Sequence, residues 1–338
     1  KSFSHSIPTG YTKWQQDNIP ETDKGVTGFT WMKNRDSGSL NHAIYDSSRG
    51  ANKLLYPNTT SVELSVTSGV SKFLKGGYAV GDASTSNNAG DSFVAWNWVG
   101  NNGTTSANTD GSGATSASTI QVNQTAGFSI VQGGYFDGSL AHGLSQAPEW
   151  IIVKESSPNT NYWYVWHHKL TSENYYMYLN TTGAQTNAGS NIWGITSTTF
   201  LKDLSLSGTR NAIAYCWHSV EGYSKFGSYT GNGSTNGTFV YTGFKPSWLM
   251  IKSSSHATSW YIFDNKRNPT NPAGKRLVAD GTFVEDAGTT EAFDFLSNGF
   301  KLRNTSNGTN GSGRSYIYMA FAEHPFIGTS SINPITAK

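Results

Sequence analysis

Trp248-Leu-Met-Ile-Lys252 is the stretch that decides the fold, because its pattern occurs three times in the chain. An aromatic residue, three mostly apolar positions and a lysine also make up Phe29-Thr-Trp-Met-Lys33 and Trp150-Ile-Ile-Val-Lys154. The copies start roughly a hundred residues apart, which is too long for solenoid repeats of about 20–50 residues. The spacing instead predicts three small domains strung along an extended molecule.

Each copy is followed by two further strand-like runs, so the repeat extends over whole units. The second run begins about a dozen residues after the start of the first, and a third run closes the unit. The second runs are His42-Ala-Ile-Tyr-Asp46, Trp163-Tyr-Val-Trp-His167 and Trp260-Tyr-Ile-Phe-Asp264. The closing runs are Phe93-Val-Ala-Trp-Asn-Trp98, Ala212-Ile-Ala-Tyr-Cys-Trp217 and Tyr316-Ile-Tyr-Met-Ala-Phe321.

The composition favours strands and turns over helices. Charged residues make up 14% of the 338 residues, aromatic residues make up 13%, and there are 37 glycines; ordinary globular proteins contain about 25% charged residues. Apolar runs alternate with Asn, Gly and Ser clusters that favour turns. We therefore expect an all-β fold, a tandem array of three related β-sandwich-like units. Both strand faces of Trp260–Phe263 are apolar, which predicts cover by a second layer or a neighbouring subunit.

The first unit lacks the segment that precedes the repeated stretch in the other two. That segment runs from Phe128 to Pro148 and from Phe226 to Pro246, so we expect the first unit to be incomplete unless upstream residues or a partner complete it. Residue 1 is not methionine, so we expect further protein before it. The predicted organisation is a truncated first repeat at 1–101, a Gly/Asn/Ser/Thr-rich linker at 102–124, a second repeat at 125–222, a third repeat at 223–327 and a tail at 328–338.

Charge, cysteine content and hydropathy argue against several classes of protein. The formal net charge of +2 supplies no general field for binding nucleic acid. Cys216 is the only cysteine, so no disulfide can form within the chain, and its apolar neighbours predict a buried thiol. No apolar stretch approaches the length of about 18 residues that a membrane-spanning helix needs, so we expect no membrane insertion.

Several motifs carry a resemblance to a known family. They include Gly222-Tyr-Ser-Lys-Phe-Gly-Ser-Tyr-Thr-Gly-Asn-Gly-Ser234, Phe293-Asp-Phe-Leu-Ser-Asn-Gly-Phe-Lys-Leu-Arg303, Tyr316-Ile-Tyr-Met-Ala-Phe-Ala-Glu-His-Pro-Phe326 and Ala95-Trp-Asn-Trp98. With these motifs the chain resembles the C-terminal module of large virion structural proteins of marine tailed phages, of the cyanophage and pelagiphage type, usually called tail fibres. The resemblance implies a place in the virion, contact with other virion proteins through the N-terminal region, and assembly as a homotrimer. It brings no catalytic or receptor-binding residues with it.

The residues that could carry catalysis or bind metal do not form a convincing pattern. Glycoside hydrolysis needs two carboxylates at a defined separation, and candidates such as Glu285 and Asp294 do not recur in the other units. His167 and His168 are adjacent on a predicted strand, so they point to opposite faces and cannot hold one metal ion. We therefore predict no catalytic residues, no metal and no cofactor, and interpret the chain as a non-enzyme.

Two repeated polar features are interpreted as structural. The lysine that ends each repeated stretch is expected to extend past the strand end to water. The Asp46-x-x-Arg49 and Asp264-x-x-Arg267 pairs are expected to form local ion pairs or hydrogen bonds that fix a turn.

Carbohydrate binding is the binding function with the best physical support, because sugars stack on aromatic side chains and pair with Asn, Asp and Thr in loops. The predicted function is recognition of a host-surface glycan or protein by a virion appendage, with the last unit facing the receptor. The alternatives are a purely structural head-decoration or tail-shaft protein and, less favoured, a glycan depolymerase. The candidate receptor-binding residues are His256, Trp260, Asn304, Asn307, Asn310 and Arg314. Of these, Trp260 alternates with Ile262 along its predicted strand, which is the pattern of a core residue.

Overall fold

The computed structural model describes residues 2–6, 13–15, 28–74, 77–100, 106–108, 118–133, 138–158, 160–200, 211–286 and 288–324. Every regular element within these ranges is a β-strand, so the predicted all-β fold is confirmed. The strands fall into three units, which we call units I, II and III in chain order. The predicted tail at 328–338 lies outside the described residues.

Unit III consists of two sheets that face each other. Phe263 and Phe293 (ring centroids 4.8 Å apart) and Phe300 and Tyr318 (5.4 Å) meet between them, so the unit is a β-sandwich. The main sheet has the order β20 (Ser224–Thr230), β27 (Ser315–Ala322), β22 (Pro246–Ser253), β23 (Tyr261–Asp264) and β24 (Leu277–Val278). The smaller sheet has the order β21 (Phe239–Tyr241), β26 (Gly299–Leu302) and β25 (Phe293–Leu296).

Units I and II are variations of the same plan. The main sheet of unit I has the order β1 (Ser2–Ser6), β9 (Ser92–Val99), β3 (Gly28–Asn34) and β4 (Ala43–Asp46). Its smaller sheets are β2 (Lys13–Gln15), β8 (Gly77–Val80) and β7 (Val70–Leu74), and β5 (Lys53–Leu54) with β6 (Leu64–Ser65). The main sheet of unit II has the order β10 (Ser106–Asn108), β11 (Ser118–Asn123), β12 (Phe128–Gly133), β19 (Asn211–Trp217), β14 (Trp150–Ser157), β15 (Trp163–His167), β16 (Tyr175–Tyr178) and β17 (Thr186–Asn187), with β13 (Leu140–Ala141) and β18 (Thr199–Phe200) beside it. Strands β10 and β11 come from the segment predicted as a linker.

The three repeated stretches form equivalent central strands. Each of β3, β14 and β22 pairs on one side with the closing strand of its unit and on the other side with the second run. The register is also preserved, because the first residue of each stretch lies opposite Trp98, Trp217 or Phe321. The repeat in the sequence is therefore confirmed as a repeat in the structure.

Strands β1 and β2 correct the expectation that the first unit lacks its leading strands. β1 pairs with β9 as β12 pairs with β19 and β20 with β27. β2 pairs with β8 in the smaller sheet, as β21 pairs with β26. The sequence Ser2-Phe-Ser-His-Ser6 is mostly polar, so it contains no apolar run that would predict β1. The strand pairs through backbone hydrogen bonds, which do not depend on the type of side chain.

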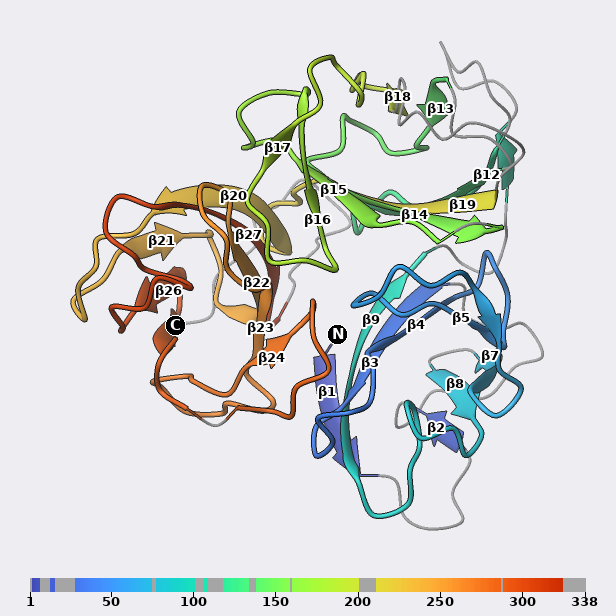
Figure 1. Cartoon of the computed structure of the whole chain (residues 1–338), viewed down its shortest axis with the longest axis horizontal. Coiled ribbons are helices and arrows are strands. Elements are labelled where there is room, and N and C mark those ends of the chain that lie inside the picture. Colours follow the sequence, from blue (N-terminus) through green and yellow to red (C-terminus); the bar gives the residue numbers. More distant parts are fainter. Residues whose placement is uncertain are drawn as a thin grey trace.

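The three units pack around a common centre and not along a line. In Figure 1, unit I (blue to cyan), unit II (green) and unit III (orange to red) meet there, and one hydrophobic core includes residues of all three. Trp98 of unit I contacts both Trp217 and Trp248, with ring centroids 6.1 and 5.5 Å apart. The same core encloses Cys216, as predicted. The extended array expected from the spacing of the copies is therefore wrong, because apolar faces of each unit are buried against the other two units.

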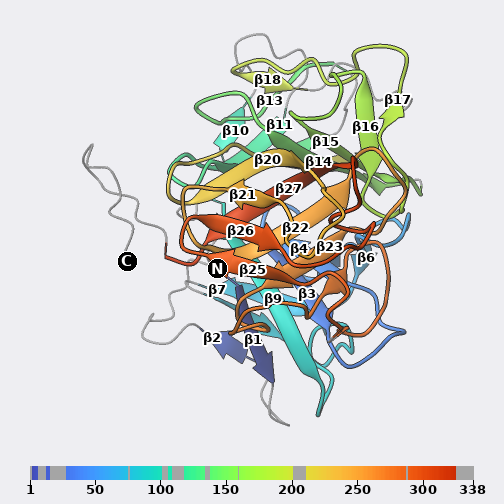
Figure 2. The same ribbon diagram turned by 90° about the vertical axis from the view of Figure 1, so that its left-hand side faces the viewer.

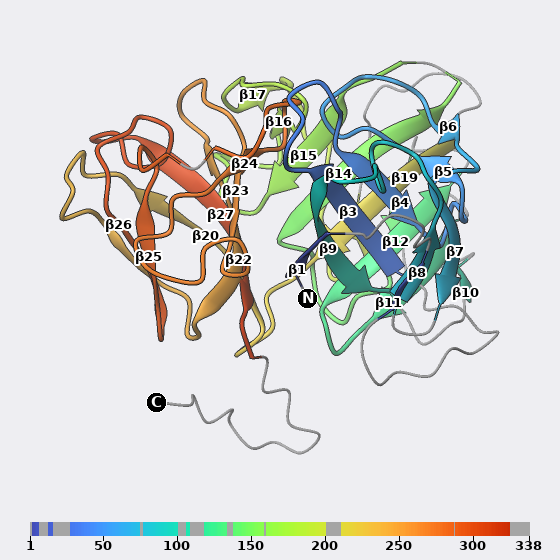
Figure 3. The same ribbon diagram turned by 90° about the horizontal axis from the view of Figure 1, so that it is seen from below.

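One kind of hydrogen bond crosses all three boundaries between units. In each unit, a ring N–H of the residue that leads into the second run donates to a backbone carbonyl of another unit. Unit II thus binds unit I, unit III binds unit II, and unit I binds unit III, which closes a ring within one chain; Figures 2 and 3 show this packing from two other sides. The pairs are Trp163 Nε1 with Tyr56 O (3.0 Å), Trp260 Nε1 with Tyr178 O (2.9 Å) and His42 Nε2 with Val278 O (3.0 Å).

The three repeated lysines are buried, which corrects the expectation that they extend to water. Lys154 Nζ donates to Thr60 O of unit I (3.3 Å), and Lys252 Nζ donates to Thr182 O of unit II (3.2 Å). In unit I the equivalent lysine donates to a carbonyl of its own unit. The reason for Lys154 and Lys252 is that a loop of the neighbouring unit lies at the strand end, so the ammonium group donates to carbonyls there and not to water.

The Asp-x-x-Arg pairs are local, as predicted, and also join units. Arg49 Nε lies 2.5 Å from Asp46 Oδ2 and Arg267 Nε lies 2.6 Å from Asp264 Oδ2, with both pairs buried. The arginine backbone amide also donates to the Asp Oδ1 in each pair, which fixes the turn. The sequence analysis did not predict that the Tyr215 hydroxyl of unit II would donate to Asp46 Oδ2 of unit I (2.6 Å).

Both faces of β23 are covered within the chain. Trp260 and Ile262 belong to the core shared by the units, whereas Phe263 lies inside the unit III sandwich. A second layer and a neighbouring unit therefore supply the predicted cover. Because these faces need no second chain, the homotrimer stays a prediction.

Candidate functional site

The six candidate receptor-binding residues divide into a buried and a surface group. Trp260, Asn304 and Asn310 are buried, whereas His256 and Asn307 are exposed and Arg314 is half-buried. All lie in or beside the loop that follows β22 or the loop between β26 and β27.

Trp260 cannot present its side chain to a receptor. It is 0% exposed, its indole N–H is used in the bond to Tyr178, and its ring lies 5.9 Å from that of Trp150. The alternation with Ile262 that indicated a core position was the correct guide. We therefore remove Trp260 from the candidate site, because its role is to join units II and III.

Asn304 and Asn310 are also wrong as receptor contacts, because they are buried and their amides are used in hydrogen bonds within unit III. Asn310 Nδ2 donates to Asn304 O (2.6 Å) and to Ser234 O (2.8 Å). Asn304 Nδ2 donates to Ala292 O (2.8 Å), and its Oδ1 accepts from the Ser306 amide (2.9 Å). These bonds hold the 304–314 loop in one conformation.

The surface residues of the two loops lie close together. Ser255 Oγ is 2.8 Å from His256 Nδ1 and also accepts from the Ser315 amide (3.0 Å), so the 253–258 loop joins the end of the 304–314 loop. A Cβ added to Gly311 would lie 2.7 Å from both Asn307 Oδ1 and Arg314 Cδ, so those two side chains flank this glycine. We call Ser255, His256, Asn307 and Arg314 the loop face of unit III.

Tyr316 is hydrogen-bonded to the backbone of the loop that carries Asn307 and Arg314. Its hydroxyl donates to Asn307 O (2.8 Å) and accepts from the Gly311 amide (2.8 Å). Burial raises the pKa of Tyr316, so the hydroxyl keeps the proton that the bond to Asn307 requires. The loop face is therefore held in place before any ligand binds.

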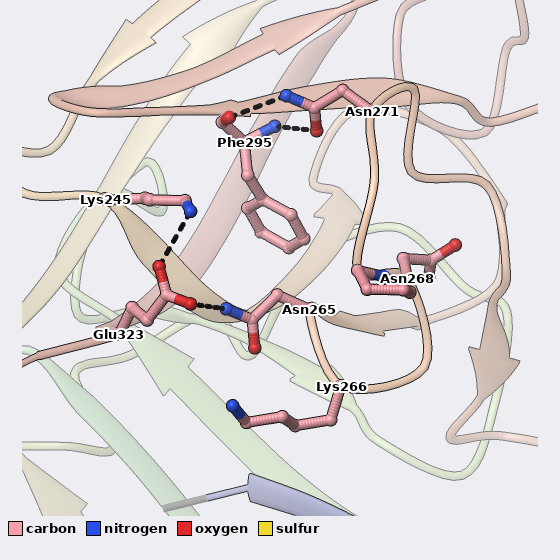
Figure 4. A pocket seen from close by; sticks show the side chains of 8 residues that line it. Lys245, Asn265, Lys266, Asn268, Asn271, Phe295 and Glu323 are labelled. Carbon is pink, nitrogen blue, oxygen red and sulfur yellow. Dashed lines mark hydrogen bonds and ion pairs between the residues drawn. The ribbon is translucent and has the colours of Figure 1, made fainter.

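A pocket of about 250 Å³ lies at another place on unit III, and the sequence analysis missed it. Figure 4 shows its lining, which combines a phenylalanine ring with amide, ammonium and carboxylate groups. The lining residues are Lys245, Asn265, Lys266, Asn268, Pro269, Asn271, Phe295 and Glu323.

Most polar groups of the pocket are already paired. Glu323 binds Lys245 Nζ (2.8 Å) and accepts from Asn265 Nδ2 (2.7 Å). Burial raises the pKa of Glu323, but the hydrogen bond and charge of Lys245 outweigh burial and lower it overall. Asn271 exchanges two hydrogen bonds with the Phe295 backbone (2.8 and 3.0 Å). Asn265 Oδ1 is the exception, because it is buried and has no hydrogen-bond partner among the described residues.

The sequence contained one signal for this pocket. Asn265 follows the Asp that ends the second run, where the other units have Ser47 and His168. Features common to all three units give no indication of a position at which the units differ. Lys245 and Glu323 are distant in sequence and have no pattern that connects them.

Residues 16–325 match the family described as a domain of unknown function (DUF7483). The chain belongs to this family. The match extends across all three units. No curated protein and no solved structure matches the chain.

The described ranges contain neither a metal-binding cluster nor a membrane-spanning helix. No group of three or more His, Cys, Asp and Glu side chains is placed there to hold a metal ion. The described part of the chain also contains no helix long and apolar enough to cross a membrane.

Proposed function

We propose that the chain is part of an external appendage of a tailed-phage virion and that unit III attaches to a glycan or protein on the bacterial surface. The loop face carries this proposal. Two loops about fifty residues apart in sequence are joined there by Ser255, and the Asn304–Asn310 bonds make the longer loop rigid. A rigid loop surface with exposed polar side chains loses little conformational freedom when it binds. The similarity of the motifs to tail-fibre modules supports the place in the virion.

Binding of the purified chain to intact cells of marine host strains tests the proposal. We expect the triple variant His256→Ala/Asn307→Ala/Arg314→Ala to bind at least about tenfold more weakly, since it removes three polar contacts of the order of 1 kcal/mol each. Its control is Lys225→Ala/Ser228→Ala/Thr230→Ala, which changes exposed residues of β20 in the same unit.

The contradicting result is equal binding of the loop-face variant and the parent, with the β-sheet circular dichroism signal intact. That result favours the second candidate, a purely structural virion component. The shared core and the ring of bonds between units support this candidate, because they make the chain a rigid block. Electron microscopy of intact particles would then locate the chain on the head or the tail.

A further inference from the structure

Four tyrosines of unit II form one aromatic cluster on β15 and β16, which are neighbouring strands in Figure 1. Tyr164 and Tyr178 lie directly opposite each other, with ring centroids 5.1 Å apart. Tyr162 stacks on Tyr178 (4.3 Å, with 26° between the ring planes), and Tyr176 lies 5.1 Å from Tyr178 and 5.5 Å from Tyr164. The four rings are therefore continuous, and we call them the tyrosine face.

The tyrosine face is accessible and also held in place. Tyr162 is 42% exposed, and the other three tyrosines are half-buried. Tyr164 and Tyr176 pack partly against the hydrophobic core. Because Tyr162 stacks on Tyr178 with one face, its exposed area lies on the opposite face and the ring edge. A ligand can therefore contact rings that are already ordered.

The cluster is particular to unit II. In unit III the residues opposite each other at the positions of Tyr164 and Tyr178 are Tyr261 and Val278. The Arg276 guanidinium lies over the Tyr261 ring, 5.2 Å from its centroid. Unit III thus has an arginine on a single tyrosine where unit II has a group of tyrosines.

The phenol hydroxyls of the face can form further hydrogen bonds. The Tyr178 hydroxyl donates to the Tyr176 hydroxyl at 3.4 Å, which is longer than the usual distance of about 2.7–2.8 Å. A phenol hydroxyl both donates and accepts. Burial raises the pKa of Tyr176 to about 12, so this hydroxyl keeps its proton at neutral pH. The face therefore offers donors and acceptors beside its rings.

Charge at the face favours an uncharged ligand. Burial is the main cause that raises the pKa of Tyr164, and the Glu155 carboxylate adds to the rise. Glu155 is 1% exposed, so its charge lies beneath the surface. The faces of aromatic rings are also electron-rich. Phosphate and carboxylate groups would be repelled by both, whereas C–H groups would be attracted to the rings.

The area of the face favours a thin ligand over a folded protein. A tyrosine side chain covers about 150–250 Å², so the four partly exposed rings together offer no more than about 400 Å². A stable protein interface needs about 800 Å² on each partner. A proline-rich peptide is thin enough, but its proline residues supply only hydrogen-bond acceptors. Sugars supply both donors and acceptors.

We propose that the tyrosine face binds an uncharged glycan chain. The C–H face of one sugar ring packs on the exposed side of Tyr162. Hydroxyls of the same or the next sugar exchange hydrogen bonds with the Tyr176 and Tyr178 hydroxyls. The proposal goes beyond the proposed function, because it concerns unit II and requires neither a virion nor a host cell.

Saturation-transfer NMR on the full chain tests the face with oligosaccharides of cellulose, laminarin, mannan and chitin, and with a proline-rich peptide. We expect Tyr162→Ala to weaken binding of the bound oligosaccharide about tenfold, because it removes the most exposed ring of the cluster. Tyr176→Phe keeps the ring and removes one hydroxyl, so we expect about fivefold weaker binding. This conservative variant tests the face even if Tyr162→Ala fails to fold. The matched control is Tyr241→Ala, since Tyr241 is 66% exposed on β21 of unit III.

Binding of one oligosaccharide that Tyr176→Phe weakens and Tyr241→Ala leaves unchanged supports the proposal. Three results overturn it: no transfer from any of the four oligosaccharides, equal weakening by Tyr241→Ala, or binding of the peptide alone. The loop-face triple variant separates the two proposals. If it loses cell binding and still binds the oligosaccharide as the parent does, the two surfaces act independently, and the tyrosine face is supported.

Discussion

The buried ion pair of Asp264 and Arg267 shows which contacts a residue pattern can predict and which it cannot. The Asp-x-x-Arg spacing was sufficient to predict a local pair at Asp264 and Arg267. It could not predict that Trp96 Nε1 of unit I donates to Asp264 Oδ2 (3.1 Å), because only the ring brings these two residues together. It also did not predict that Glu285, in the same unit as Arg267, lies 3.1 Å from Arg267 Nη1. The same limitation explains why Trp260 was placed among the receptor contacts.

Replacing Asp264 by Ala leaves the Arg267 guanidinium, which is 0% exposed, without its main counter-charge. We expect a loss of about 3–5 kcal/mol in the free energy of unfolding, because a buried ion then lacks compensation. Asp294→Ala is the control, since Asp294 pairs with the more exposed Arg303 and its loss costs about 1 kcal/mol or less. Denaturant titration measures both, and similar losses for the two variants would contradict the argument.

At the scale of elements, the repeated strand was predicted correctly but its lysine was not. The repeated pattern correctly predicted β3, β14 and β22 as equivalent strands. It did not indicate that another unit would cover the end of β14 and of β22. Burial lowers the pKa of Lys252 to about 7 and the pKa of Lys154 to about 8. Lys33, whose strand end is buried in unit I, has a pKa lowered by burial to about 8.

These lowered pKa values predict how stability depends on pH. Between about pH 7 and 10.5 the unfolded chain keeps lysine protons that the folded chain has released, so the unfolded state binds more protons. The free energy of unfolding should therefore rise with pH from about 7 to 9, and below pH 7 this contribution should stay constant. Lys252→Met should reduce the rise, whereas Lys169→Met, at an exposed position, should not. Urea titrations across this range provide the measurement, and an unchanged slope in Lys252→Met would refute the burial argument.

At the scale of the molecule, the number of units was predictable and their arrangement was not. Periodic runs showed three copies, yet the bonds that close the ring involve side chains whose partners lie in other units. A strand that is buried on both faces has the same apolar sequence pattern whether its second face is covered by its own unit or by the next one. The pocket was missed for a related reason, because it exists where one unit departs from the others.

A shared core predicts a single cooperative unfolding transition. Calorimetry of the full chain should give one peak with a van't Hoff enthalpy close to the calorimetric enthalpy. Tyr215→Phe removes the hydroxyl that donates to Asp46 across the boundary between units I and II. We expect it to lower the stability by about 1–3 kcal/mol without splitting the peak. Two or three resolved peaks would show that the units unfold independently.

The ring arrangement also limits where the chain can be divided. Trp163, Trp260 and His42 each supply one of the three bonds between units, so removing any one unit breaks two of them and uncovers part of the shared core. A fragment that lacks one unit therefore presents a large apolar surface, and such surfaces promote aggregation. Shortened forms of the chain for binding experiments should keep all three units.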